Sequence, residues 1–319
     1  ETGSVSTISA TREASEEFAC FGSTCRVHVA GDGALGSAPE AAAAARRALL
    51  GWHARFSRFE AASELTLLNA DPRATVPVGS LLARLAETAS TVGSLTGGLV
   101  DATLVDEVRS AGYAAHFDAP SLPLPSALAL APPRRPASPS RRAGWRELAV
   151  DPVAGTVTRP PGLKLDSGGI AKGLFGDVLS LELADYASFA IDCGGDIKLG
   201  GSAGLTREVE VAGPFDEQIL HRFTLRDGAA ATSGIGKRSW LRADGGPAHH
   251  LLDPGSGEPA FTGIVQVTAL APTGVLAEAL SKAALLAGPD GADGWLTRGG
   301  VIVYDDGSHR VVQPPLTNL

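Results

Sequence analysis

The sequence is poor in methionine, cysteine and aromatic residues. Its 319 residues include no methionine, three cysteines and an aromatic fraction of 5%. No apolar run reaches the roughly 18 residues that a membrane-spanning helix needs, so no transmembrane segment is predicted in this chain. The net charge of −8 gives no electrostatic reason to expect nucleic acid binding. The remaining composition, with 39 glycines, is that of a globular protein with one large core or two lobes.

The absence of methionine also bears on the N-terminus. Because the chain begins at Glu1, we expect the natural N-terminus to be missing, and a signal or lipid anchor could have been removed with it. Residues 1–17 are polar, and we expect them to be disordered or foreign to the natural protein. A single domain is predicted over residues 18–313. We expect an extracytoplasmic or membrane-associated location rather than a cytoplasmic one.

The three cysteines leave one question open. Cys20 and Cys25 are close enough in sequence to form a disulfide in an oxidising compartment, whereas Cys193 lies in an apolar run and is expected to be buried. An odd number of cysteines without a Cys-x-x-Cys pair argues against a structural zinc site.

Hydrophobic periodicity predicts an α+β fold, because strands in hairpin-like clusters are interspersed with long helices. A capping-box pattern with proline in the first turn opens a helix at residue 38, and two glycines follow the helix that ends near residue 95. The predicted helices cover 38–56, 80–95, a segment after 170, and 276–286. The predicted strands cover 18–30, 188–192, 207–211, 265–271 and 301–304. Residues 119–144, rich in proline and arginine, are predicted to form a solvated loop.

The stretch Asp166-Ser167-Gly168-Gly169-Ile170-Ala171-Lys172-Gly173 is the most informative motif. Two glycines ahead of a predicted helix allow a ligand to approach the backbone, and the free N–H groups of a helix start attract anions. Lys172 adds a positive charge, so the stretch can hold a phosphate or pyrophosphate. It is not a Walker A loop, because no Ser or Thr follows the lysine. The alternative is a tight strand-to-helix turn with a surface lysine.

Other turns carry an acid, a hydroxyl or a histidine in a fixed order along the chain. Each is commonly structural when it stands alone, but their joint order resembles the ApbE family, the FAD:protein FMN transferases, from about Phe18 to Gly307. The residues that carry the resemblance are Phe56-Ser57-Arg58-Phe59 with Ser63-Glu64-Leu65 and Asn69, Thr96 to Thr103, Asp166 to Gly173 with Asp177, Gly194-Gly195-Asp196, Ala231 to Gly234, and His250 to Gly257 with Pro259.

The resemblance implies a T-fold-like architecture of antiparallel sheets packed with long helices, and an FAD site in the cleft between lobes. It also implies an activity: moving FMN from FAD onto a Thr or Ser hydroxyl of a target flavoprotein, with release of AMP and with Mg²⁺ as cofactor. The positions that it assigns to FAD binding are Phe21, Phe59, Leu99, Val100, Asp101, Asp166, Lys172, Thr232 and Leu252.

By the same resemblance, His250 matches the proposed catalytic base. A base is chemically reasonable here, because an alcohol is a poor nucleophile until its proton is accepted and an imidazole titrates near neutral pH.

The chain departs from the family at the implied metal site. The family uses an Asp, a Thr four residues later and a main-chain carbonyl, which align with Glu278, Lys282 and Gly169. Glu278, with Ser281, can still bind Mg²⁺ through oxygen, but a protonated Lys282 cannot. We therefore expect weakened Mg²⁺ binding at Gly169, Glu278 and Ser281. The alternative is that Lys282 replaces the metal as a fixed positive charge.

Three other functions are considered. The first is an FAD pyrophosphatase that gives FMN and AMP, with water as the nucleophile. The second is a non-catalytic FAD-binding protein. The third, a nicotinamide enzyme, is weak because no Gly-x-Gly-x-x-Gly follows a predicted strand. The sequence does not identify the acceptor protein or the oligomeric state.

Overall fold

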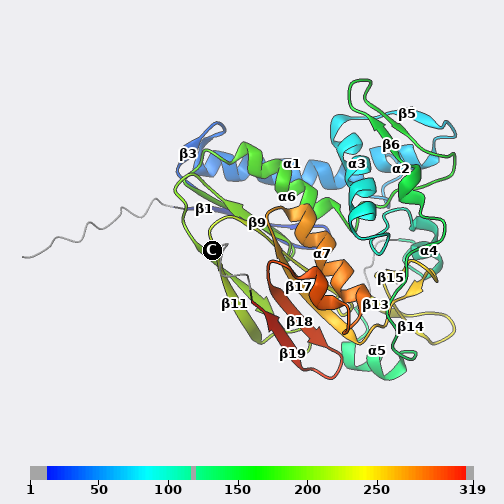
Figure 1. Ribbon diagram of the computed structural model, residues 1–319. Helices are drawn as coiled ribbons and strands as arrows, with labels where there is room; N and C mark the ends of the chain where they lie inside the picture. The colour runs from blue at the N-terminus through cyan, green and yellow to red at the C-terminus, as the bar shows by residue number, and fades with distance from the viewer. Residues whose placement is uncertain (1–12, 116–119, 314–319) are drawn as a thin grey trace, which may run out of the picture.

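A computed structural model describes residues 13–115 and 120–313. Its centre is an eight-stranded antiparallel sheet whose strands come from both ends of the chain, in the order β1-β2-β8-β9-β12-β17-β18-β19 (Figure 1). The strands are β1 Ala14–Cys20, β2 Ser23–Ala30, β8 Ser188–Cys193, β9 Ile197–Gly200, β12 Gly228–Gly234, β17 Ile264–Ala271, β18 Gly300–Tyr304 and β19 His309–Val312. Every residue of β17 is buried, as expected for a strand covered on both faces.

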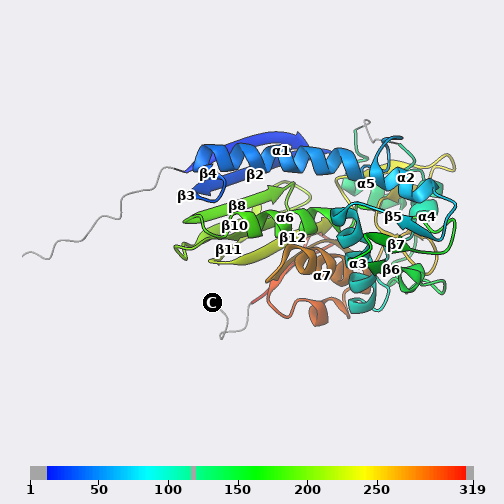
Figure 2. The same cartoon turned by 90° about the horizontal axis from the view of Figure 1, so that it is seen from above.

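Three long helices pack on this sheet side by side (Figure 2). Helix α1 (Ala38–Phe56) contacts β1 and β2, α6 (Ala171–Glu182) contacts β8 and β9, and α7 (Gly274–Ala287) contacts β12 and β17. The predicted capping box opens α1, since the Ser37 N–H donates to the Glu40 carboxylate at 2.8 Å.

A second layer lies beside α6 and α7 (Figure 1). Its main helix is α3 (Ser80–Leu95), which ends at Gly97 and Gly98, both with positive φ, as their position after the helix predicts. Short elements surround α3: β5 Thr75–Pro77, β6 Ala149–Asp151 and β7 Thr156–Thr158 in one sheet, a 3-10 helix at Gly144–Glu147, and helices α2 Glu64–Ala70 and α4 Val105–Ser110.

The remaining elements are short or lie at the edges of the fold. They are the hairpin of β10 Arg207–Ala212 and β11 Ile219–Leu225, the pairs β3 Asp32–Gly33 with β4 Gly36–Ser37, β13 Ser239–Leu241 with β14 Pro247–His249, and β15 Leu252–Asp253 with β16 Glu258–Pro259, and a 3-10 helix at Ala292–Trp295. The inward residues of the hairpin, Val209, Val211 and Phe223, join the core cluster of the central sheet.

Helices α6 and α7 hold each other's first turns. The Asp177 carboxylate of α6 accepts from the N–H groups of Gly274 (2.6 Å) and Val275 (3.0 Å) at the start of α7. The Glu278 carboxylate of α7 accepts from the Gly173 N–H in the first turn of α6 at 2.9 Å. A Cβ added to Gly173 would lie 2.5 Å from the Gly274 backbone, so only glycine allows this approach. The crossing fixes the start of α6, where the stretch Asp166–Gly173, the central motif, lies.

Three predictions of secondary structure were wrong. Strand β1 begins at Ala14, within the predicted disordered segment, because residues 14–17 pair with residues 26–29 of β2. The single strand predicted over 18–30 is a hairpin that turns at Phe21 and Gly22, both with positive φ. The predicted loop over 119–144 contains helix α5 (Leu124–Leu130), which packs on β13 and β14.

The cysteines are all free and buried, which contradicts the Cys20–Cys25 disulfide and confirms the burial of Cys193. The hairpin register explains the result. Cys20 lies opposite Ser23, and Cys25 lies opposite Phe18 on one side and Cys193 on the other.

Candidate active site

The central motif forms the loop that leads into α6. The Asp166 N–H donates to the Ala102 carbonyl at 2.8 Å, which joins the motif to the turn after α3. The Asp166 carboxylate accepts from the Gly168 N–H at 2.9 Å and lies 3.4 Å from the Arg58 guanidinium. Two of the predicted FAD-contacting segments are therefore adjacent in space.

Lys172 is not a surface lysine, so the structure argues against the alternative of a simple turn. Its ammonium lies 2.5 Å from the Asp196 carboxylate, which is almost fully buried. Burial opposes the charged form of Lys172, but the carboxylates of Asp196 and Glu278 outweigh it and raise the pKa of Lys172. The second Asp196 oxygen accepts from the Thr232 N–H at 3.2 Å. Asp196 thus connects Lys172 with the predicted position on β12.

The two predicted aromatic residues lie near the C-terminal end of α1, Phe21 in the β1–β2 turn and Phe59 just after the helix. The Phe21 ring is 4.9 Å from the His53 ring, edge to face. The Phe59 ring is 5.3 Å from the Tyr113 ring, and the Arg58 guanidinium lies over both, 4.3 and 4.7 Å from their centroids. Arg58 therefore contacts Phe59 and Asp166 at once, and it fixes the aromatic group beside the central motif.

The turn Leu99–Asp101 follows the C-terminus of α3. The buried Val100 donates its N–H to the Thr96 hydroxyl at 3.0 Å. One Asp101 oxygen accepts from the N–H and hydroxyl of Thr103 at 2.8 and 2.6 Å, and the other is buried without a hydrogen-bond partner among the described residues. A buried carboxylate oxygen without a donor is costly, which makes it a candidate contact for a ligand hydroxyl or N–H.

His250 lies between β14 and β15, two residues before the buried Leu252. Its Nδ1 atom is buried without a hydrogen-bond partner among the described residues. Burial first, and then the charges of Arg238 and Lys282, hold the pKa of His250 well below its ordinary value. His250 is therefore neutral in the unliganded protein at neutral pH and has a ring nitrogen that can accept a proton.

The residues predicted to bind Mg²⁺ meet around Lys282. A Cβ on Gly169 would lie 3.6 Å from Lys282 Cε, and the Lys282 ammonium lies 3.0 Å from Glu278. The Ser281 hydroxyl shares a hydrogen bond of 2.8 Å with Ser233 and donates to the Glu278 carbonyl at 3.1 Å. The side-chain oxygen atoms of Glu278 and Ser281 thus have partners within the protein. No cluster of three His, Cys, Asp or Glu side chains suited to a metal occurs within residues 13–115 and 120–313. This donor set does not fit Mg²⁺.

Sequence reasoning missed Arg238 as a site residue. Its guanidinium donates to the Phe21 carbonyl at 2.5 Å, and its charge acts on both Lys172 and His250. Among the described residues, no carboxylate lies within ion-pair distance of Arg238. No motif signals this residue, because Arg238 follows β12 and reaches the β1–β2 turn 217 residues away. Asp196 and Arg58 stood within quoted motifs but had no assigned role.

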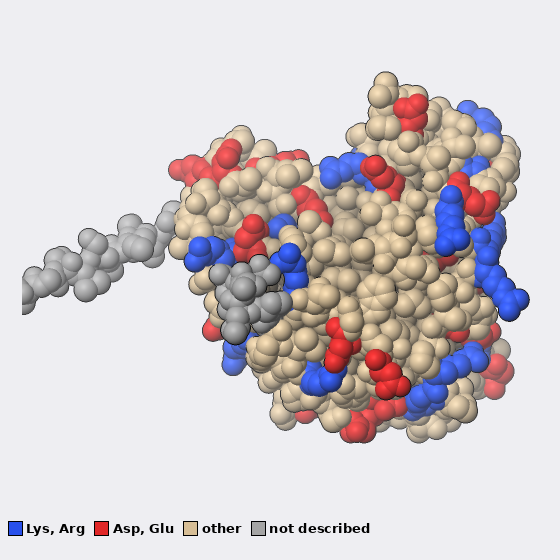
Figure 3. All heavy atoms as spheres, viewed as in Figure 1, with Lys and Arg blue, Asp and Glu red and all other residues tan. Residues whose placement is uncertain are grey.

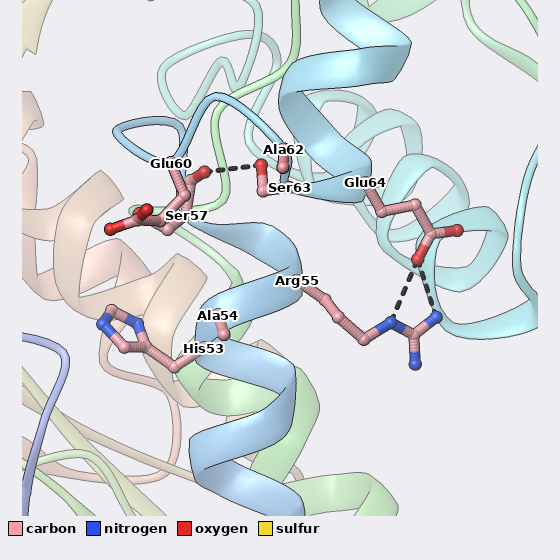
Figure 4. Close-up of a pocket in the computed structure, with 8 residues that line it drawn as sticks. All are labelled: His53, Ala54, Arg55, Ser57, Glu60, Ala62, Ser63 and Glu64. Carbon is pink, nitrogen blue, oxygen red and sulfur yellow. Dashed lines mark hydrogen bonds and ion pairs between the residues drawn. The ribbon is translucent and has the colours of Figure 1, made fainter.

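A cavity of about 440 Å³ lies next to the aromatic residues, at the end of α1 and the loop to α2 (Figure 4). Its lining includes His53, Ser57 and Glu60. Arg55 and Glu64 reach toward one another at 2.6 Å, while His53 points to the other side of α1, where it meets Phe21. The cavity is large enough for part of a small-molecule ligand.

On the face drawn in Figure 3, Lys and Arg side chains are interspersed with Asp and Glu side chains, and several Lys and Arg side chains lie along the right-hand edge.

The fold and this site define an α+β protein with partly buried lysines, a neutral histidine and a glycine-rich helix start, which suits a ligand with phosphate groups. The model of the ApbE family matches residues 21–304, so the chain belongs to the ApbE family. This confirms the predicted family and, with the structural comparison below, the predicted fold class.

Known proteins and a solved structure are similar to this chain. A FAD:protein FMN transferase of Salmonella typhimurium is 24% identical over 236 residues, which cover 72% of this chain and 65% of that protein. One of Treponema pallidum is 31% identical over 141 residues, 40% of this chain and 39% of that protein. Both matches thus cover less than two thirds of the relative's length. The crystal structure of the ApbE protein of Thermotoga maritima has a TM-score of 0.76 at 23% identity and covers 94% of this chain and 97% of its own.

The buried histidines predict an acid-sensitive fold. Burial lowers the pKa of His249 to about 3. Below the ordinary value of about 6.5 the unfolded chain binds a proton that the folded chain does not, so the free energy of unfolding falls as pH falls. His249 alone should cost about 2 kcal/mol at pH 5 relative to pH 8.

Urea unfolding of the unliganded protein and of His249→Gln at both pH values measures this contribution. The variant should lose less stability on acidification. An equal loss in the two proteins would contradict the prediction.

Proposed function

We propose that this chain is a FAD:protein FMN transferase, which moves FMN from FAD onto a Thr or Ser hydroxyl of a target flavoprotein and releases AMP. Membership of the ApbE family supports this assignment, as do the names of the similar proteins. The observation that carries it is His250, whose Nδ1 has no hydrogen-bond partner among the described residues and whose pKa is lowered by burial and by the charges of Arg238 and Lys282. The base can accept the proton of an alcohol nucleophile, and the nearby cations can stabilise the charge on the phosphate that it attacks.

In the proposed mechanism, His250 accepts the proton of the acceptor hydroxyl. The hydroxyl oxygen forms a bond to the FMN phosphorus, and the bond from that phosphorus to the oxygen of AMP breaks, so AMP leaves with the electron pair. Lys172, Lys282 and Arg238 offset the negative charge of the phosphates. Arg58 and Asp166 orient the flavin side of the site through Phe59. We assign no step to Mg²⁺, because the donor set does not fit it.

The decisive experiment incubates the protein with FAD and a candidate acceptor flavoprotein and measures the intact mass of every species. Transfer gives an acceptor heavier by FMN less one water, together with AMP. Free FMN and AMP without an adduct would instead support the pyrophosphatase. FAD that stays bound and unchanged would support the non-catalytic FAD-binding protein.

We also predict that the chain binds FAD more tightly than FMN or NAD. The predicted contact positions form two groups: Asp101 and Phe59 lie near Asp166, and Lys172 and Thr232 are connected through Asp196. A ligand with both halves would contact more of them. Titration followed by flavin fluorescence measures the affinities, with NAD as a competitor. Absence of saturable FAD binding at micromolar concentrations would contradict the proposed function.

The acceptor and the location remain proposals. An acceptor with a Thr or Ser hydroxyl follows from the proposed reaction, and an extracytoplasmic or membrane-associated location is our expectation. Within the described residues, no helix is both long and apolar enough to cross a membrane.

A further inference from the structure

Lys282 lies among the groups that the resemblance assigned to a metal ion. Its side chain is 11% exposed, its ammonium is 3.0 Å from a Glu278 oxygen, and its last carbons pack against Gly169. A positive charge of the protein itself is thus already at this position. Because residues four apart share a helix face, Glu278 and Lys282 can pair without distorting α7.

Both oxygens of the Glu278 carboxylate already bond to groups of the protein. It is fully buried, with one oxygen on Lys282 and the other on the Gly173 N–H of α6. Turning it toward a metal would leave a buried N–H without an acceptor and an ammonium without its partner, and each loss is costly. The extra methylene of glutamate relative to aspartate lets this carboxylate span from α7 to α6. Glu278 is therefore a helix cap and an ion-pair partner.

The charges near the site are also consistent with a lysine in place of a metal ion. A carboxylate with a divalent cation carries a net charge of +1, whereas Glu278 with Lys282 carries none. Arg238 supplies the missing unit of positive charge. It has no ion-pair partner in the described part of the chain, and its charge acts on Lys172 and His250. A phosphate ligand thus meets protein cations in place of a metal.

We propose that the Lys282 ammonium, held by Glu278, takes the place of the divalent cation opposite the pyrophosphate of FAD, so that FAD binds without metal. The ligand is taken from the proposed function, on which this inference rests. The three residues assigned to the metal then have other roles. Gly169 lies against the lysine stem, Glu278 holds its charge, and Ser281 bonds to Ser233 of β12.

The test measures FAD affinity by fluorescence titration in excess chelator and in excess Mg²⁺, for the wild-type chain and for Lys282→Met. The wild-type affinity should change by less than about twofold between the two conditions. Lys282→Met should weaken binding by about tenfold or more in both, because one charged contact with phosphate is lost. Lys282→Arg, which keeps the charge, should retain metal-independent binding.

Lys198→Met is the matched control. Lys198 is 10% exposed and lies 3.1 Å from Asp227, so its exposure and ion-pair distance match those of Lys282, but it bonds to Asp227 and to the Pro272 carbonyl. It should bind FAD like the wild type. Circular dichroism confirms that each variant is folded.

The outcomes separate this inference from the proposed function. Wild-type binding that disappears in chelator, or Lys282→Met binding that equals the wild type, overturns the role of Lys282 and leaves the transferase intact. No FAD binding by the wild type under either condition overturns the proposed function itself. A weakened affinity in Lys282→Met that the Lys198→Met control does not share supports the inference.

Discussion

Replacing His250 with alanine is expected to lower the rate of AMP release from FAD by about 10²- to 10⁴-fold, the usual contribution of a general base. FAD affinity should change by less than about threefold, because a base acts in the transition state rather than in the bound ground state. Single-turnover assays of AMP, together with a fluorescence titration of the same variant, measure the two quantities. Loss of binding and of turnover in equal measure would show that His250 is a binding residue and no base.

His249→Ala is the control for this prediction, because adjacent histidines are easily misassigned. The His249 ring packs edge to face on Phe261 at 4.8 Å, and its Nδ1 accepts from the Leu251 N–H at 3.3 Å. It is 1% exposed, so its loss should reduce stability and leave the turnover of folded protein close to normal. If His249→Ala were inactive and His250→Ala active, the catalytic base would be His249 and not His250.

Replacing Gly173 with alanine is expected to lower the free energy of unfolding by about 3 kcal/mol or more, at the upper end of what overpacking costs. The added Cβ would lie 2.5 Å from backbone atoms of Gly274, and neither backbone can yield without separating α6 from α7. The two reciprocal caps, Asp177 to Gly274 and Glu278 to Gly173, would lengthen together. Lys282 would lose its position with them, so FAD affinity should also fall.

Gly51→Ala gives the matched comparison. Gly51 also lies within a long helix, but nothing lies within 4 Å of the Cβ that alanine would add. There the substitution should stabilise the protein by roughly 0.5–1 kcal/mol, since alanine restricts the unfolded chain and favours helix. Urea unfolding of both variants gives the two values. Equal effects of Gly51→Ala and Gly173→Ala would contradict the importance of the helix crossing.

The sequence predicted those elements whose signals lie within a turn or two of the chain. Helix α1 begins at its capping box and ends at Phe56, and α3 runs from Ser80 to Leu95 before its two glycines, both as predicted. The order of motifs was also sufficient to identify the ApbE family and its fold. Local hydrogen bonds and hydrophobic spacing determine these features, so no knowledge of the tertiary structure is needed.

Segments without such signals were predicted poorly. The turn at Phe21 requires a positive φ at a phenylalanine, which local preference argues against, and the surrounding hairpin imposes it. Helix α5 lies in a stretch whose prolines favour a loop, and its packing on β13 and β14 overrides that preference. Tertiary contacts decided both.

The sequence by itself determined which chemical groups this protein has: a histidine beside a strand, a lysine behind two glycines, and a glutamate four residues before a lysine. The tertiary structure decided what those groups do. Glu278 bonds to an N–H 105 residues away, and Asp196 reaches Lys172 and Thr232 from a separate turn. Such pairings depend on how α6 and α7 cross over the sheet, and a crossing is set by the packing of distant residues, which no local pattern records.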